Sequence, residues 1–315
     1  MLQTFRQSLA SHGYVEGRDV IIETRWAGGR IDQLPALAAE MVGLRVDIIV
    51  GVGAVVARAA KSVTTTIGSP RMAPASAPPD IDAPGAQWYK VDGSNGRKFL
   101  TAILRPQGTG PFPVVVVLHS AAGLTNSHLS LAEDLARAGF LVVIGCWHAG
   151  NRPTPGNAAC SEAIPQAEWV ADPAANSGKE LIAIAKTLPN AKADRVGLYG
   201  ISCGGYAALW AASTGAGVQA VVADAPAHRP AITPAPASSQ DVVARLDAQL
   251  LILHGPADKA IPVEQSREYE RAARALGKSI AVVYLEGVGH EPSSLLPESQ
   301  IEARQRAIAF LREKL

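Results

Sequence analysis

A serine in a glycine-flanked pentapeptide is the clearest candidate for a reactive group in this sequence. Residues 200–204 read GISCG, which has the pattern G-x-S-x-G. The apolar run Val196–Tyr199 before it predicts a buried strand, and the alanine-rich segment Tyr206–Ala212 after it predicts a helix. A strand, a tight turn and a helix around this pattern are the context of a nucleophile elbow, in which the serine lies at the apex of a strained turn. We therefore predict that Ser202 is a nucleophile.

A serine hydroxyl is a poor nucleophile at neutral pH, so it needs a base and an acid that orients the base. His290 follows the last predicted strand, Ile280–Leu285, in a glycine-flanked loop, and we predict that it is the base. Asp258 lies in a turn just after the predicted strand Leu250–Leu253, and we predict that it is the acid. Asp224, at the end of the preceding strand, is the alternative acid. The chain order serine, acid, histidine is the one expected for this kind of site.

The same chemistry requires an oxyanion hole, which two backbone N–H groups usually form. One should belong to Cys203, the residue after the nucleophile. The other should come from the loop after the predicted strand Val114–Leu118, and we assign it to Ala121. The Cys203 thiol is an alternative nucleophile, but the register of the motif puts Ser202 at the apex. We therefore predict that Cys203 is a small buried side chain.

The elements that must position these residues alternate between strand and helix from about residue 86 to 315. The segment begins with a predicted antiparallel hairpin of Gln87–Val91 and Lys98–Leu104. Continuous apolar strands separated by helices follow, which predicts an α/β fold with a doubly wound, mostly parallel sheet. In such sheets, reactive groups lie beyond the carboxyl ends of the strands, where every candidate above falls. The irregular segment 146–173 is a candidate lid. The C-terminal helix is expected to bury Ile301, Ile308, Leu311 and Leu315.

Composition excludes several other functions. The 315 residues carry a net charge of +1, with 18% charged and 48% hydrophobic residues. The sequence has no basic or acidic block of the kind that binds nucleic acids or membrane surfaces. No apolar segment is long enough to span a bilayer. The three cysteines, Cys146, Cys160 and Cys203, have no metal-ligand spacing and cannot all pair, so we expect no metal site and no disulfide framework. The predicted serine chemistry also needs no cofactor. Because no signal peptide is visible either, we expect a cytoplasmic protein; the sequence does not indicate its oligomeric state.

The first 68 residues form a separate predicted unit. Helices are predicted for Thr4–Ser11, Ile31–Leu44 and Ala54–Ser62, and strands for Asp19–Arg25 and Val46–Val50. This alternation predicts a small parallel sheet. Residues 69–85 are rich in proline, alanine and serine, so we predict a linker there and a domain of residues 86–315 after it.

Residues 86–315 resemble the α/β-hydrolase superfamily, in the branch of dienelactone hydrolases and prolyl-oligopeptidase-type catalytic domains. The segments that carry the resemblance are PFPVVVVLHSAAG, GLYGISCGGYAAL, LLILHGPADKAIPVEQS and GVGHE. It implies an α/β-hydrolase fold and a Ser-His-Asp triad of Ser202, His290 and Asp258. Dienelactone hydrolases typically carry cysteine where this chain has Ser202, and an acidic residue in the oxyanion loop where it has Ser120.

Residues 1–68 are similar to the start of the first lobe of ABC-transporter substrate-binding proteins of the periplasmic-binding-protein fold. The similarity runs through the segment from Gly13 to Ile67 and then stops. That family also has an export signal, a hinge and a second lobe, which are not seen here. We therefore interpret residues 1–68 as a truncated fragment fused to the second domain, without a binding function of its own.

These observations predict a serine hydrolase that cleaves a carboxylic ester of a small molecule through an acyl-enzyme. The alternatives with the same chemistry are a serine peptidase or amidase of prolyl-oligopeptidase type and a dienelactone hydrolase. A solute-binding protein built on residues 1–68 is an alternative from another class, and so is a non-catalytic protein of the same fold. Neither the acyl group nor the alcohol group of the substrate follows from the sequence.

Overall fold

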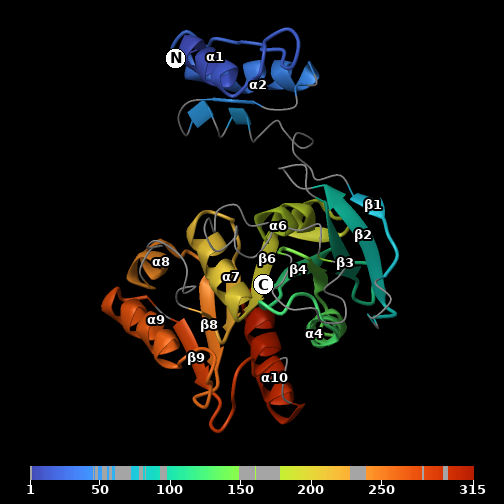
Figure 1. The fold of residues 1–315 in the computed structure, drawn as a ribbon, viewed down its shortest axis with the longest axis vertical. Helices are drawn as coiled ribbons and strands as arrows, with labels where there is room; N and C mark the ends of the chain where they lie inside the picture. The colour runs from blue at the N-terminus through green and yellow to red at the C-terminus, as the bar shows by residue number, and fades with distance from the viewer. Residues whose placement is uncertain are drawn as a thin grey trace. The chain divides into compact units, whose positions relative to one another are not determined.

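The fold was derived from a computed structural model of the chain. The structure describes residues 2–315 except 45, 47–48, 52–54, 57–58, 61–71, 78–80, 82, 93–97, 149–159, 161–177, 228–238, 279 and 294–296. The chain divides into two units, Met1–Ser69 and Pro70–Leu315 (Figure 1). Most of the predicted helix 54–62 and most of the candidate lid 146–173 lie outside the described residues.

The first unit contains two of the three helices that its sequence predicts; most of the third lies outside the described residues. Helix α1 spans Leu2–Ser11, and a short 3-10 helix, Ile31–Gln33, leads directly into α2, Leu34–Gly43. Pro35 lies in the first turn of α2, where its missing N–H has no helical partner to lose.

The strands predicted for this unit are wrong where they can be judged. In the segment Asp19–Arg25, only Val20 takes part in a β-bridge, and its partner is the nearby Glu16. The side chain of Ile21 in this segment is 84% exposed, and that of the adjacent Trp26 is 71% exposed. The described residues of the other predicted strand, 46, 49 and 50, are not in a strand either.

The second unit is built on one large sheet. Its nine described strands lie in the order β1-β2-β3-β5-β4-β6-β7-β8-β9 (Figure 1). Their bounds are β1 Met72–Pro74, β2 Ala86–Asp92, β3 Lys98–Leu104, β4 Phe112–Leu118, β5 Leu141–Gly145, β6 Ala191–Ile201, β7 Ala220–Asp224, β8 Gln249–His254 and β9 Ile280–Tyr284. In this order, each pair of neighbours from β5 through β4 and β6 to β9 is parallel. The pairs β1–β2, β2–β3 and β3–β5 are antiparallel. The prediction of a mostly parallel α/β sheet is therefore confirmed.

The predicted linker extends too far along the chain. Residues 72–74 form β1 at the edge of the sheet, and Met72, Ala73 and Pro74 pair with residues of β2. A proline is tolerated there because an edge strand has one side without a ladder of hydrogen bonds.

Helices cover the sheet in two groups. Their bounds are α4 Asn126–Arg137, α6 Gly178–Thr187, α7 Cys203–Ser213, α8 Ser239–Arg245, α9 Glu264–Ala275 and α10 Pro297–Lys314. Helices α4 and α10 contact each other, whereas α6, α7, α8 and α9 follow one another in contact (Figure 1). Among the described residues, no helix is both long enough and apolar enough to cross a lipid bilayer.

The C-terminal helix buries most of the predicted face. Leu311 is fully buried, and Ile308 and Leu315 are partly buried against the core, whereas Ile301 is 65% exposed. Ala303 and Ala307, which were not predicted, are also fully buried, and their small side chains let α10 lie close to β7 and β8, which it contacts. The prediction for Ile301 was wrong because large apolar residues alone were assumed to mark the inward face.

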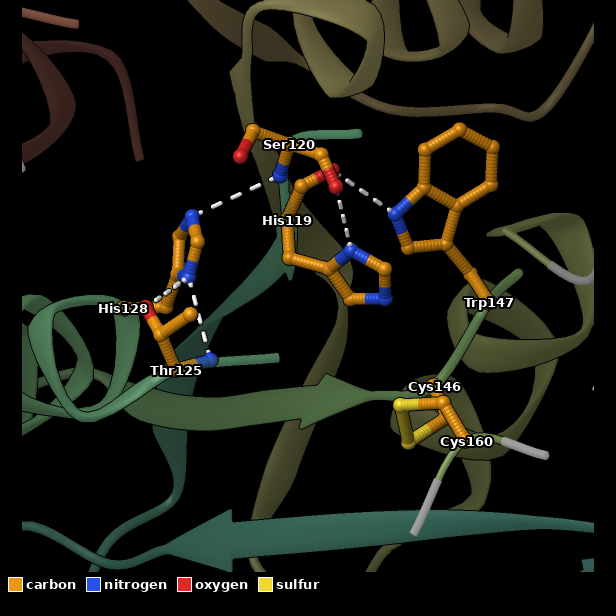
Figure 2. Close-up of a disulfide and its surroundings, with 7 residues drawn as sticks. All are labelled: His119, Ser120, Thr125, His128, Cys146, Trp147 and Cys160. Carbon is orange, nitrogen blue, oxygen red and sulfur yellow. Dashed lines mark hydrogen bonds between the residues drawn. A yellow bond between two sulfur atoms is a disulfide. The ribbon is translucent and has the colours of Figure 1, made fainter. Parts of the chain in front are cut away.

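Two of the three cysteines form a disulfide. Cys146, just after β5, is bonded to Cys160, with 5.0 Å between their Cα atoms (Figure 2). Cys203 is free and buried. No disulfide framework was expected, yet one disulfide is present, because the spacing of cysteines in a sequence does not reveal which of them the fold brings together. The cysteines therefore no longer support the expectation of a cytoplasmic protein.

The disulfide can be tested by counting thiols. In protein purified without reductant, unfolded in guanidinium chloride and treated with a maleimide, we expect one adduct, at Cys203, and three adducts after reduction. Mass spectrometry of the intact chain gives the count, and Cys160→Ser should yield two adducts without reduction. Three adducts before reduction would rule out the disulfide.

The second unit should fold without the first. All buried residues of its connected hydrophobic core lie between Ile81 and Leu311 in the sequence. The partly buried hydrophobic residues that pack against this core lie between Met72 and Leu315, so they also belong to the second unit. We expect a chain of residues 70–315 to unfold cooperatively, with a thermal midpoint within about 3 °C of that of the full chain, because each kcal/mol shifts the midpoint of a domain of this size by only a few degrees. Calorimetry of both chains measures this, and a midpoint lower by about 10 °C or more would contradict it.

Candidate active site

Ser202 lies at the sharp turn between β6 and α7. Its backbone angles are φ 56° and ψ −115°, which a residue with a side chain rarely adopts. The Ser202 N–H donates to the Asp224 carbonyl oxygen at 2.8 Å, and its own carbonyl oxygen accepts from the N–H groups of Gly205 and Tyr206. These bonds hold the backbone in a conformation that costs about 1–3 kcal/mol.

Glycine is required next to this turn. A Cβ at Gly204 would lie 2.2 Å from the carbonyl oxygen of Leu118, the last residue of β4. A Cβ at Gly200 would lie 2.1 Å from the carbonyl oxygen of Gly204 itself. The turn therefore packs against the end of β4, and this brings it beside the loop that follows Leu118.

His290 lies between Ser202 and Asp258. Its Nε2 is 3.0 Å from Ser202 Oγ, and its Nδ1 is 2.6 Å from Asp258 Oδ2. The imidazole side chain is 18% exposed, whereas the Asp258 side chain is fully buried. Since a carboxylate accepts hydrogen bonds, Nδ1–H donates to Asp258, and Nε2 is left to accept the Ser202 hydroxyl proton.

Asp258 is held as an anion by several donors. Its Oδ1 accepts from the N–H groups of Ala260 and Ile261 at 2.7 and 2.8 Å, and its Oδ2 lies 3.1 Å from His254 Nε2. Burial opposes the charge, but hydrogen bonds from His254, His290 and Ile261 outweigh it and hold the pKa of Asp258 well below its ordinary value. His254 is itself oriented by Ser266, whose Oγ is 2.6 Å from Nδ1.

The pKa of His290 is raised above its ordinary value. Burial lowers this pKa, but the hydrogen bond to Asp258 and the negative charges of Glu291, Asp258 and Asp224 raise it by more. The imidazolium form is thus favoured, which is the form that results when Nε2 takes a proton.

Asp224 does not contact His290. Its Oδ2 accepts from the backbone N–H of Ser293 at 3.0 Å and from the Ser293 hydroxyl. Burial raises the pKa of Asp224 to about 7, so this carboxyl is partly protonated near neutral pH. The carbonyl oxygen of Ser293 in turn accepts from Nε of the buried Arg304 in α10 at 2.9 Å, and Arg304 also pairs with Asp134 in α4 at 2.6 Å.

The loop after β4 offers one backbone donor at the predicted position. Ser120 N–H donates to His128 Nε2, Ala122 N–H to Ser120 Oγ, and Gly123 N–H to the Ser120 carbonyl oxygen. Those three N–H groups therefore have partners in the loop or in α4, whereas Ala121 N–H has no hydrogen-bond partner among the described residues. Cys203 begins α7, where N–H groups of the first turn have no partner within the helix.

Buried rings pack beneath this loop (Figure 2). Trp147, next to the disulfide, donates from Nε1 to the His119 carbonyl oxygen at 3.0 Å, and His119 Nδ1–H donates to the Ser120 carbonyl oxygen at 2.8 Å. Burial lowers the pKa of His119 to about 4 and that of His128 to about 3, so both rings are neutral at pH 7. The loop is thus held by Trp147 through a backbone carbonyl oxygen and by two histidine rings that add no positive charge.

The Cys203 thiol is not suited to attack. It is buried, its Sγ is 3.6 Å from His148 Nε2, and burial raises its pKa well above the ordinary value. A thiol acts as a nucleophile only as the thiolate, which is disfavoured here. In the described part of the chain, no group of three or more histidine, cysteine, aspartate or glutamate side chains is arranged to hold a metal ion.

Sequence reasoning missed Glu291, which lies at the same site. It directly follows His290, has a φ of 52°, and its Oε1 is 3.6 Å from His290 Nε2. The available signal was a charged residue between the predicted base and Pro292. Ser293 and His254 were also missed, because nothing in their local sequence indicates that they support the two carboxylates.

Comparison with known proteins gives relatives of this chain both by sequence and by structure. The chain is 30% identical over 208 residues to the probable 2-oxo-3-(5-oxofuran-2-ylidene)propanoate lactonase of Bradyrhizobium, a match that covers 64% of this chain and 82% of the relative. A dienelactone-hydrolase-like promiscuous phosphotriesterase from metagenomic libraries has a similar structure, with a TM-score of 0.57 and 18% identity over 73% of this chain and 98% of that one. A puromycin-hydrolyzing peptidase of Mycobacterium tuberculosis gives a TM-score of 0.58 and 18% identity over 73% of this chain but 39% of the peptidase. At these identities the two structures indicate the fold alone.

The family is given by the sequence of the second unit. Residues 99–313 match the dienelactone hydrolase family, and this match covers more than half of the 315 residues. It includes Ser202, Asp258 and His290. The chain therefore belongs to the dienelactone hydrolase family and is a hydrolase.

Proposed function

We propose that this protein is a serine hydrolase that cleaves a carboxylic ester or lactone of a small molecule through an acyl-enzyme. The observation that carries the proposal is the continuous hydrogen-bonded line from Ser202 Oγ through His290 to Asp258 Oδ2, with contacts of 3.0 and 2.6 Å. Acid, base and nucleophile in this order are the arrangement that activates a serine hydroxyl.

Acylation follows from this geometry. As Ser202 Oγ forms a bond to the acyl carbon, its proton passes to His290 Nε2, and the electron pair of the C=O bond moves to the oxygen. The N–H groups of Cys203 and Ala121 donate to this oxyanion, which typically supplies about 3 kcal/mol per donor. Collapse of the intermediate breaks the bond to the leaving alcohol, which takes the proton from His290.

Deacylation reverses these roles. Water gives a proton to His290 Nε2 as its oxygen attacks the acyl carbon, and the bond to Ser202 Oγ then breaks as Oγ takes the proton back. Asp258 remains ionised throughout, since its pKa is held low, and its charge stabilises the imidazolium in both steps. No group outside the chain and the substrate is required to balance protons or electrons.

The class of substrate rests on the relatives. The Bradyrhizobium relative is described as a lactonase, and a lactone is a cyclic ester that the same steps would open. The peptidase or amidase alternative stays a prediction from the sequence, because the peptidase in the comparison shares only the fold. The fusion of residues 1–68 from a substrate-binding protein and the cytoplasmic location also stay proposals from the sequence.

The assignment of the acid can be tested with two matched variants. Asp258→Asn should lower kcat by about 10⁴-fold, because the amide cannot hold the imidazole in the required tautomer. Asp224→Asn should change kcat by less than about tenfold, because among the described residues the Asp224 carboxyl accepts from Ser293 and not from His290, and it is partly protonated near neutral pH. Steady-state kinetics on a p-nitrophenyl ester measure both, and the reverse ranking would assign the acid to Asp224.

The nucleophile can be tested by covalent labelling. A fluorophosphonate probe should form one adduct on Ser202 Oγ with loss of fluoride, and Ser202→Ala should abolish it. Cys203→Ala is the matched control, because it removes the neighbouring thiol and keeps the backbone N–H, and it should still be labelled. Equal labelling of Ser202→Ala and the unaltered chain would refute the mechanism, and hydrolysis of amino-acid p-nitroanilides with no hydrolysis of p-nitrophenyl esters would favour the peptidase.

A further inference from the structure

The backbone of Glu291 has a conformation that residues other than glycine rarely adopt. Its φ of 52° lies in the left-handed region, which glycine adopts readily and residues with a Cβ do not. Asn190, Ser202 and Ala225 are the other described non-glycine residues with a positive φ, and Ser202 is the proposed nucleophile. Strained positions of this kind cluster at active sites, where the surrounding structure holds them in place.

The conformation directs a buried carboxylate to the reactive side of the imidazole. Glu291 is 6% exposed, and its Oε1 is 3.6 Å from His290 Nε2. Nε2 is the nitrogen that faces Ser202, whereas Asp258 contacts Nδ1 on the opposite side of the ring. The ring of His290 therefore lies between two carboxylates, one on each nitrogen.

We propose that Glu291 is a positioning residue of this site, whose carboxylate stabilises the imidazolium of His290 when Nε2 holds the proton taken from Ser202. The inference rests on the proposed function, because it requires His290 to act as the base. Glu291 transfers no proton and forms no bond to the substrate; it acts through the charge on His290.

The electrostatic surroundings support this role. The groups that raise the pKa of His290 against the effect of burial are Asp258 from the loop after β8, Glu291 from the same loop as His290, and Asp224 from the end of β7. Asp224 is partly protonated near neutral pH, so its contribution is reduced there. Glu291 also raises the pKa values of Asp224 and of the Cys203 thiol, which places negative charge at the centre of this group of side chains.

The sign of the effect gives a specific test by pH. Glu291→Gln keeps the size of the side chain and removes its charge, so the imidazolium is less favoured and His290 should lose its proton at lower pH. We expect the acid-side midpoint of the profile of kcat/KM against pH to fall by about one unit or more, as for other groups that lose a nearby opposite charge. The plateau of kcat at alkaline pH should fall about three- to tenfold, because Nε2 is then a weaker base.

A matched control and a second variant make the result specific. Glu286→Gln alters an exposed glutamate of the same loop and should leave the midpoint unchanged. Glu291→Gly also removes the charge and suits the positive φ, so it should shift the midpoint as Glu291→Gln does even if the glutamine variant folds poorly. A loss of kcat with an unmoved midpoint in both variants would overturn the proposal, because it would indicate a purely structural role. A carboxylate could instead bind a positively charged substrate directly. A rise in KM confined to an ester with a quaternary ammonium group, with an unmoved midpoint, would indicate that role and would overturn the proposal too.

A spectroscopic measurement separates this inference from the proposed function. Titration of the His290 ring by ¹⁵N NMR, in the unaltered chain and in Glu291→Gln, reads its protonation without turnover. Absence of fluorophosphonate labelling on Ser202 would contradict the proposed function, whatever the titration gives. Normal labelling together with equal titration midpoints in the two proteins would contradict only the role of Glu291.

Discussion

The close approach of the turn after β6 to the end of β4 is the contact on which the site depends. There is no room for a side chain at Gly204, because the Leu118 carbonyl oxygen occupies that space. This contact sets the first N–H groups of α7 beside the loop that begins at His119. Ser202 and the N–H groups that we propose as the oxyanion hole are thus held together by backbone packing, and the rings of His119 and Trp147 donate hydrogen bonds to carbonyl oxygens of the loop. The proposed nucleophile and its proposed oxyanion donors therefore depend on the same backbone contact.

Asp224 and Asp258 lie at the carboxyl ends of neighbouring strands and are both buried, yet the pKa of Asp224 is raised and that of Asp258 is lowered. Asp258 accepts two backbone N–H groups and lies beside two histidine rings, so its charge is compensated. The Asp224 carboxyl accepts from Ser293 alone among the described residues, and burial is the dominant effect on its pKa. The difference depends on the donors that each loop supplies, since the two residues are of the same type and follow neighbouring strands.

Much of the second unit could be predicted from its sequence because its strands are continuous apolar runs separated by helices. The positions of Ser202, Asp258 and His290 at the ends of such strands were predictable for the same reason. Glu291 could not be found this way, because its importance depends on a backbone angle and on the direction of one side chain. The strand predicted at Asp19–Arg25 failed because apolar alternation gives a strand only where a neighbouring strand pairs with it. Ile301 and the disulfide likewise depend on which surfaces the fold brings together.

The contacts of Ser293 connect the loop of His290, the proposed base, to the last helix. Ser293 lies three residues after His290; its N–H and hydroxyl are bound by Asp224, and its carbonyl oxygen by Arg304 of α10, which also reaches Asp134 of α4. The loop carrying the base is therefore anchored at one point to the sheet and at another to the helices on its face. Displacement of α10 relative to the sheet would move Ser293 and, through it, the ring that faces Ser202. Evolution could thus adjust the distance between base and nucleophile by substitutions in a helix that touches neither, leaving the reactive residues themselves unaltered.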